Sequence, residues 1–503
     1  MRIRRTSRRS RRAVALTLAL AGAIVLAACA PAPPAPPAPT LPSVPGEQPN
    51  PDAGAAANRM IFWTKCWDVV SMSDADLDRW RSQGVGGFVC KLNYLYGLGG
   101  DQSFTGDPNS PLAGTAFSLQ KAIRDTGIVQ RAATRDIKLW LGIGANSYWT
   151  DQAPFAEWFD EGTWANSVLP NLRNLAAGMR TLGFAGIAWD EELYPGKSGI
   201  ASTWNWNYRG NTRSEADVRA QVRHRGAQVM EALVAGYPDV ELVTIGWRLP
   251  EGWEELVQQE VNGVFANNAR SVSTDFWNGL TSVAGYKAIR FMDSVFNKTP
   301  HLYKSSWQSA LMYNANRLYS LFSRRFSNWE YASSRVHVAP FAWIDTGPAP
   351  FEASRPPEHV RTQLAAFRQW SAGGVFANYA YQPLRNFDYT PWVPAMQGAA
   401  VPGAVDTQPP TIDVAGARPR NGATVTLTGA AGDDMGVRAV RWRTATGRTG
   451  AATMNWVVTS GDWAAGYEWR TDWSADVPAL PGEAVTLTVE DIKGIKHSVT
   501  VAG

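Results

Sequence analysis

The chain of 503 residues is poor in the residue types that carry metal and nucleophilic chemistry, with five histidines and three cysteines. No histidine pair has metal-ligand spacing, so we do not expect a zinc or two-metal hydrolase. No Gly-x-Ser-x-Gly turn is present, which argues against a nucleophile-elbow hydrolase. A glycine-rich phosphate turn is also missing after the first expected strand, where the sequence reads Lys65-Cys66-Trp67. We therefore expect neither a metal nor another cofactor.

Excess positive charge is also largely missing, although the formal net charge is +4. Seven of the 48 basic residues are arginines within the first twelve positions, which leaves 41 basic against 44 acidic residues in the remainder. This balance lacks the excess of basic residues that is typical of nucleic-acid-binding proteins. We expect no nucleic-acid partner.

Residues 1–28 combine a basic start with an apolar run from Ala13 to Ala28, which is typical of an export signal. The run ends in Leu26-Ala27-Ala28-Cys29, which resembles the lipobox of bacterial lipoproteins. That resemblance implies lipid attachment at Cys29 and an extracytoplasmic protein anchored to the bacterial cell membrane. An ordinary signal with a chance cysteine is the alternative. Ser10-Arg11-Arg12 partly resembles a twin-arginine signal, so the export route stays open.

Residues 29–57 are rich in proline and alanine and cannot bury a core. We expect them to form a largely polyproline spacer.

In residues 58–403, runs typical of strands alternate with helical patterns. Eight such units predict an α/β fold, a (β/α)8 TIM barrel that is the catalytic domain, with a doubly wound open sheet as the alternative. This interpretation makes Gly263–Asn267 the sixth strand and treats Ala269–His301 as an insertion before the seventh unit. The expected strands are Met60–Lys65, Gly87–Leu92, Ile137–Ile143, Ala185–Asp190, Val240–Trp247, Gly263–Asn267, Val336–Ile344 and Val375–Tyr379.

Residues 404–503 change pattern to seven short alternating runs separated by turn signals. This pattern predicts an all-β immunoglobulin-like sandwich. It resembles accessory modules of secreted bacterial polysaccharide enzymes. A spacer or packing role is one interpretation. Carbohydrate binding is the other, through Trp456, Trp463, Trp469 or Trp473.

The stretch from Gly183 to Gly196 reads GFAGIAWDEELYPG and turns from apolar to acidic within a predicted strand. Alternation gives one face Gly186, Ala188, Asp190 and Glu192, which suits a barrel interior and its open end. The other face carries the bulkier side chains and Glu191, and suits a coat of helices. A bulge at the strand end would place Glu191 on the inner face and its acidic neighbours on the outer face.

Polar and aromatic residues follow every predicted strand, where a parallel barrel carries its active site. Stacking faces beside amide, cationic and carboxylate groups suit an array of sugar hydroxyls. The 23 tryptophans serve either such stacking or core packing. We expect substrate-binding roles for Lys65, Asp68, Lys91, Asn93, Tyr94, Asn146, Trp149, Tyr194, Trp247, Arg248, Asn267, Trp343, Asn378, Tyr379 and Tyr381.

Glycoside hydrolysis requires two carboxyl groups, and Glu192 with Asp190 or Asp345 are the best candidates for the catalytic residues. The alternatives are an acidic helix start or surface pair for Asp190 and Glu192, and a capped turn for Asp345.

The stretch FAGIAWDEELYPG resembles the fourth-strand signature of family 18 chitinase-like glycoside hydrolases, Phe-Asp-Gly-aliphatic-Asp-aliphatic-Asp-x-Glu-Tyr-Pro. The match needs one inserted residue, Leu193, and alanines stand at Ala185 and Ala188 where the family has aspartates. The resemblance implies that Glu192 is the general acid and that Asp190 orients an N-acetyl group. Because it covers about a dozen residues, it supports a sugar-cleaving barrel more than an amino-sugar substrate.

Cys66 and Cys90 end the first two predicted strands, and an exported protein favours a disulfide between them. Free buried thiols or a nucleophilic cysteine are the alternatives. Taken together, the sequence predicts a monomeric glycoside hydrolase that acts on a carbohydrate substrate and is held at the membrane by a lipid anchor. The alternative is a non-catalytic glycan-binding lipoprotein with a degenerate barrel.

Overall fold

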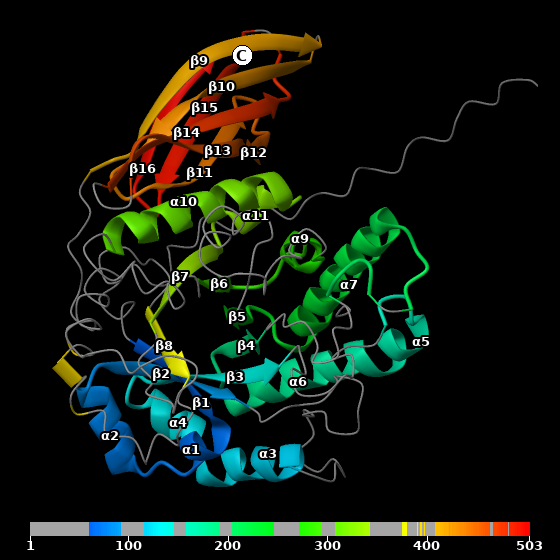
Figure 1. Cartoon of the computed structure of the whole chain (residues 1–503), viewed down its shortest axis with the longest axis vertical. Helices are drawn as coiled ribbons and strands as arrows, with labels where there is room; N and C mark the ends of the chain where they lie inside the picture. Colours follow the sequence, from blue (N-terminus) through cyan, green and yellow to red (C-terminus); the bar gives the residue numbers. More distant parts are fainter. Residues whose placement is uncertain are drawn as a thin grey trace, which may run out of the picture. The chain divides into compact units, whose positions relative to one another are not determined.

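The computed structural model places an α/β region before an all-β region (Figure 1). None of the helices in the part of the chain it describes is long and apolar enough to span a membrane. The described residues are 60–91, 115–144, 157–190, 204–208, 210–245, 271–293, 307–342, 375–379, 408–421, 423–462, 466–480 and 482–502, with short pieces at 390, 393–394 and 397.

The α/β region is built on a curled sheet of parallel strands, which pair in chain order. β8 pairs with β1 along Met60–Trp63, but with β7 only at Phe341 and Ala342. The strands are β1 (Met60–Lys65), β2 (Val85–Lys91), β3 (Lys138–Gly144), β4 (Gly186–Asp190), β5 (Glu241–Ile245), β6 (Ala288–Asp293), β7 (Val336–Ala342) and β8 (Val375–Tyr379).

Helices follow each of the first six strands and lie outside the sheet (Figure 1). Local signals explain several helix ends: Ser73 and Ser214 cap the helices that follow them, and Gly183 ends its helix at φ 84°. The helices are α1 (Cys66–Val70), α2 (Asp74–Ser82), α3 (Thr115–Thr126), α4 (Ile128–Ala133), α5 (Glu161–Thr163), the π-helix η1 (Trp164–Val168), α6 (Leu169–Leu182), α7 (Glu215–Gly236), α9 (Ser273–Ser282), α10 (Trp307–Arg325) and α11 (Trp329–Ala332).

The sixth strand corrects the sequence prediction. β6 is Ala288–Asp293, which pairs with β5 on one side and β7 on the other. It lies inside the segment that the sequence suggested was an insertion, and α9 lies there too. Arg290 in the middle of β6 makes this strand hard to recognise from the sequence, because a central strand normally lacks charged residues. The cation is accommodated by an ion pair to Glu241, with Nε and Oε1 2.7 Å apart and both side chains buried.

The all-β region contains two antiparallel sheets of four strands each, ordered β13-β14-β10-β9 and β12-β11-β15-β16. The short strand β12 was missing from the seven predicted strands, since three residues are too few for a clear alternation. The strands are β9 (Thr411–Asn421), β10 (Thr424–Gly432), β11 (Val437–Thr444), β12 (Thr449–Ala451), β13 (Thr453–Asp462), β14 (Gly466–Val477), β15 (Ala484–Asp491) and β16 (Lys496–Ala502).

The edge strand β13 is covered by α10 through serine side chains. Ser320 Oγ donates to the Met454 carbonyl and accepts from the Trp456 N–H, each at 2.9 Å. Ser323 Oγ accepts from the Met454 N–H at 2.8 Å. Asn316 adds a fourth bond, from the Val437 N–H at the start of β11. Residues spaced three or four apart share one helix face, so α10 meets the backbone groups that an edge strand leaves open.

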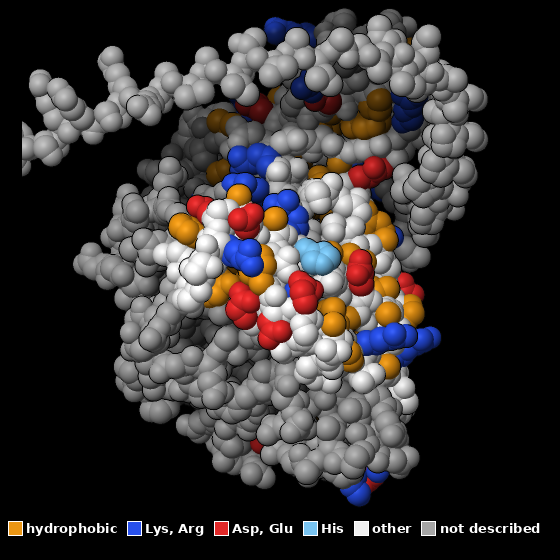
Figure 2. All heavy atoms as spheres, turned by 90° about the vertical axis from the view of Figure 1, so that its right-hand side faces the viewer, with side chains coloured by type: hydrophobic (Ala, Val, Ile, Leu, Met, Phe, Trp, Pro, Cys, Tyr) orange, Lys and Arg blue, Asp and Glu red, His pale blue; other side chains and the backbone are white. Residues whose placement is uncertain are grey.

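The described surface in Figure 2 mixes acidic and basic side chains rather than separating them by sign. Ion pairs of the same mixed kind occur on α7, where Arg219 meets both Glu215 and Asp275 at 2.8 Å.

Candidate functional site

The carboxyl ends of the parallel strands converge at one edge of the sheet, the usual location of a site in such a fold. Among the residues that end strands there, Lys65, Lys91, Asp190, Asp293 and Tyr379 can bind or react with a polar ligand.

The two faces of β4 divide as the sequence predicts. Ala188 packs with Trp63, Trp140 and Val243 in a small apolar cluster on one face of the sheet. Ile187 and Trp189 belong instead to the large core shared with the helices. Asp190 ends β4 two residues after Ala188, in register with Gly144 on β3 and Ile245 on β5. Asp190 is therefore the last residue on the face of β4 that also carries Gly186 and Ala188. We call these three residues the inner row of β4.

Gly186 allows β4 and β5 to approach closely. A Cβ atom at this position would lie 1.9 Å from the Glu241 carbonyl oxygen, so no other residue fits without a backbone shift. The small residues of this strand thus serve packing and position the acidic strand end.

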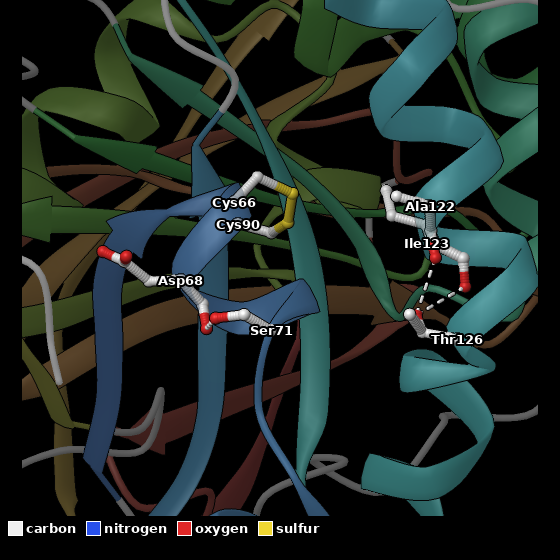
Figure 3. Close-up of a disulfide and its surroundings, with 7 residues drawn as sticks. All are labelled: Cys66, Asp68, Ser71, Cys90, Ala122, Ile123 and Thr126. Carbon is white, nitrogen blue, oxygen red and sulfur yellow. Dashed lines mark hydrogen bonds between the residues drawn. A yellow bond between two sulfur atoms is a disulfide. The ribbon is translucent and has the colours of Figure 1, made fainter.

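The predicted disulfide between Cys66 and Cys90 is present, with Cα atoms 4.1 Å apart (Figure 3). It joins Cys66, the first residue of α1, to Cys90, the penultimate residue of β2. Asp68 is half-buried in α1, and its carbonyl accepts a hydrogen bond from Ser71 Oγ at 3.0 Å. The disulfide holds the ends of β1 and β2 together at the edge where the candidate residues gather.

A buried ionic pair lies at the opposite end of the sheet. Burial alone would raise the pKa of Glu241, but the charge and hydrogen bond of Arg290 outweigh it and lower that pKa. Glu241 begins β5, and Arg290 is in register with Val243. Because this carboxylate lies at the amino end of its strand and is fixed by an arginine, we assign it to stability rather than to chemistry.

Tryptophans in the connections that follow β3 and β4 serve the core. Trp158 stacks on Trp164 with ring centroids 5.8 Å apart, and meets Trp204 edge-on at 5.2 Å. Phe276 of α9 also packs edge-on against Trp204. All four side chains are buried, so these rings are not available as sugar platforms. The packing interpretation of the tryptophan excess holds for them.

The predicted site residues divide into three groups. Asp68, Cys66 and Cys90 are described fully, and Lys65, Lys91, Asp190, Asn378 and Tyr379 are placed by their strands. Asn267 does not end the sixth strand, because β6 ends at Asp293. The remaining predictions lie outside the described residues: Cys29, Asn93, Tyr94, Asn146, Trp149, Glu192, Tyr194, Trp247, Arg248, Asn267, Trp343, Asp345 and Tyr381.

Two residues at this edge were missed by the sequence prediction. Asp293 ends β6 and adds a carboxyl group at the strand ends. The signal was the run AIRFMD, an apolar strand that ends in an acid. Trp67 lies in α1 with 41% of its surface exposed, beside the disulfide. Its signal was its position directly after Cys66.

No protein-family model matches the chain, and no curated protein matches it. Within the described part of the chain, no group of three or more histidine, cysteine, aspartate or glutamate side chains could hold a metal ion.

Proposed function

We propose that this chain is an extracytoplasmic glycoside hydrolase, anchored by a lipid at Cys29, with a complete (β/α)8 barrel followed by an immunoglobulin-like sandwich. The observation that carries the proposal is the position of Asp190 at the carboxyl end of β4. Asp190 follows Ala188 on the inner row of β4, and Ala188 packs in one cluster with Trp63 and Trp140. Glu192 comes two residues later, beyond the strand.

In the proposed reaction, Glu192 protonates the glycosidic oxygen as the bond to the leaving group breaks. Asp190 stabilises the positive charge that develops on the sugar ring, or orients a neighbouring group of the substrate. Water completes the hydrolysis by forming a bond from its oxygen to the anomeric carbon. The second carboxylate either takes a proton from that water as a base, or first attacks the carbon as a nucleophile and is then displaced by water. It comes from Asp345, three residues after the end of β7, or from Asp293 at the end of β6. Glycosidases separate the two carboxyl groups by about 5–10 Å, and facing strand ends can supply that distance.

The test uses the chain from Asn58 onward and a panel of polysaccharides, with release of reducing ends as the readout. The wild type is expected to hydrolyse at least one glycan, and Glu192→Gln to lose a factor of about 10²–10⁴ if Glu192 is the general acid. Saturable binding of a glycan without any product would contradict the proposal and establish the glycan-binding alternative instead.

A further inference from the structure

Two lysines stand side by side at the ends of β1 and β2. Lys65 and Lys91 are register partners in the parallel pairing of these strands. The same register pairs Trp63 with Val89, both in the small apolar cluster. Alternation therefore gives the two lysines the same face as this cluster, one step further toward the strand ends. Neighbouring strands lie about 4.8 Å apart, so the backbone positions of the two lysines are adjacent.

Such a pair of like charges destabilises a sheet, and here it is held in place covalently. Cys66 follows Lys65, Cys90 precedes Lys91, and the disulfide joins these two cysteines (Figure 3). The link opposes separation or slippage of the strands, which would otherwise relieve the repulsion. The link therefore keeps the two lysine positions next to each other at this point of the edge.

The strand positions in register beside the lysines are not acidic. Gly142 of β3 lies opposite Lys91, and β8 ends at Tyr379, opposite Trp63. The carboxyl groups that end strands, those of Asp190 and Asp293, belong to β4 and β6. β4 is two strand spacings from β2, about 10 Å. The acidic residues that end strands are therefore at least two strands away from the lysines, whereas Asp68 of α1 comes three residues after Lys65.

A flat apolar ring accompanies the lysines. Trp67 is the exposed tryptophan among those that the structure describes, and it lies in the first turn of α1. The disulfide fixes the backbone of Cys66 immediately before it. An exposed indole ring and lysines at neighbouring backbone positions together suit a sugar that carries negative charge, since an indole ring stacks on a sugar ring and an anionic group pairs with ammonium.

We propose that Lys65, Lys91 and Trp67 form a subsite for a sugar that bears an anionic group, so that the substrate is an acidic polysaccharide. We call these three residues the basic subsite. The proposal rests on the proposed function and names its substrate class. The subsite would hold an acidic sugar on the β1–β2 side, while the bond to be cleaved lies toward Asp190.

Binding can be measured separately from hydrolysis by affinity electrophoresis through gels that contain a glycan. The probes are polygalacturonate and chondroitin sulfate, each compared with its neutralised form, carboxyl-reduced or desulfated and reduced. The first probe presents a carboxylate alone and the second adds sulfate. The wild type is expected to be retarded by at least one anionic polymer and much less by its neutral form. Retardation should weaken in high salt, because screening reduces the attraction.

The double variant Lys65→Gln/Lys91→Gln is expected to bind the anionic polymer at least tenfold more weakly, whereas Lys65→Arg/Lys91→Arg retains binding. Trp67→Ala should weaken binding even in high salt. The matched control is Lys138→Gln, an exposed lysine at the amino end of β3, on the opposite edge of the sheet. Circular dichroism and thermal unfolding establish that each variant is folded.

Equal retardation of the wild type and the folded lysine-to-glutamine variant would overturn the basic subsite, as would failure of every anionic polymer to bind. Hydrolysis of a neutral glycan that depends on Glu192 but not on the lysines would leave the proposed function standing without the subsite. Lysine-dependent binding of an anionic polymer without any hydrolysis would establish the subsite and reject the hydrolase.

Discussion

At the scale of single residues, His337 ties the stability of the protein to pH. Its side chain is fully buried on β7, in register with Arg290, and both ring nitrogens lack a hydrogen-bond partner among the described residues. Burial is the main cause that lowers the pKa of His337 well below its usual value, and the positive charges of Arg438 and Arg290 lower it further. The folded protein therefore holds this imidazole neutral.

A depressed histidine pKa means that the unfolded chain binds a proton first as pH falls. His337 should therefore lower the free energy of unfolding by about 1.4 kcal/mol for each pH unit below about 6.5, the pKa of histidine in the unfolded chain. This loss continues until the pH reaches the pKa of His337 in the folded protein. Denaturant unfolding at pH 5 and pH 7.5 should show a smaller difference for His337→Leu than for the wild type. His224→Gln, which changes an exposed histidine of α7, is the control and should keep the wild-type difference. An unchanged pH dependence in His337→Leu would refute this role.

At the scale of elements, α10 replaces a neighbouring strand for the edge of β13. Ser320 and Ser323 bond the backbone of Met454 and Trp456, and these serine side chains are buried. Removing one hydroxyl leaves buried backbone groups without their partner, which costs about 1–3 kcal/mol.

Ser320→Ala should therefore destabilise the protein more than Ser323→Ala, because Ser320 serves two backbone groups of β13. Chemical denaturation measures both, with Ser82→Ala as the control, since Ser82 is exposed and its hydroxyl donates to the Arg79 carbonyl within α2. If Ser320→Ala unfolds at the same denaturant concentration as Ser82→Ala, the helix does not support this edge.

The elements also show what a sequence can and cannot reveal. The two faces of β4 could be predicted, because Gly186, Ala188 and Asp190 alternate with bulky residues over the whole strand. β6 could not, because Arg290 interrupts its apolar run and its partner Glu241 is 49 residues away. Only the pairing in space shows that this charge is neutralised, and the identification of Asp293 as a strand end depends on that knowledge.

At the scale of the whole molecule, the α/β and all-β regions belong to one compact unit. Side chains of α10 bond the all-β region, and Arg441 Nε of β11 donates to Oγ of Ser333, the residue after α11, at 3.0 Å. These polar contacts link the two regions, a feature that the sequence did not reveal, because turn signals and alternation report only local structure.

We expect the chain from Asn58 to unfold in a single calorimetric transition. A fragment that ends at residue 407 should be insoluble or unfolded, because it leaves the polar face of α10 without its partner. A matched fragment of residues 408–503 should associate through the uncovered edge of β13. A soluble 58–407 fragment with the melting temperature of the longer chain would show that the regions are independent modules.

The most direct test of the central claim is hydrolysis by two neighbouring variants, Glu192→Gln and Glu191→Gln, on the glycan that the wild type cleaves fastest. The alternation seen in β4 predicts that Glu192 continues the row of Asp190, and that Glu191 continues the row of Trp189, which packs with the helices. Glu192→Gln should lose a factor of about 10²–10⁴ in kcat and still bind the glycan, whereas Glu191→Gln should stay within a few-fold of the wild type. Equal activity of Glu192→Gln and the wild type would contradict the account.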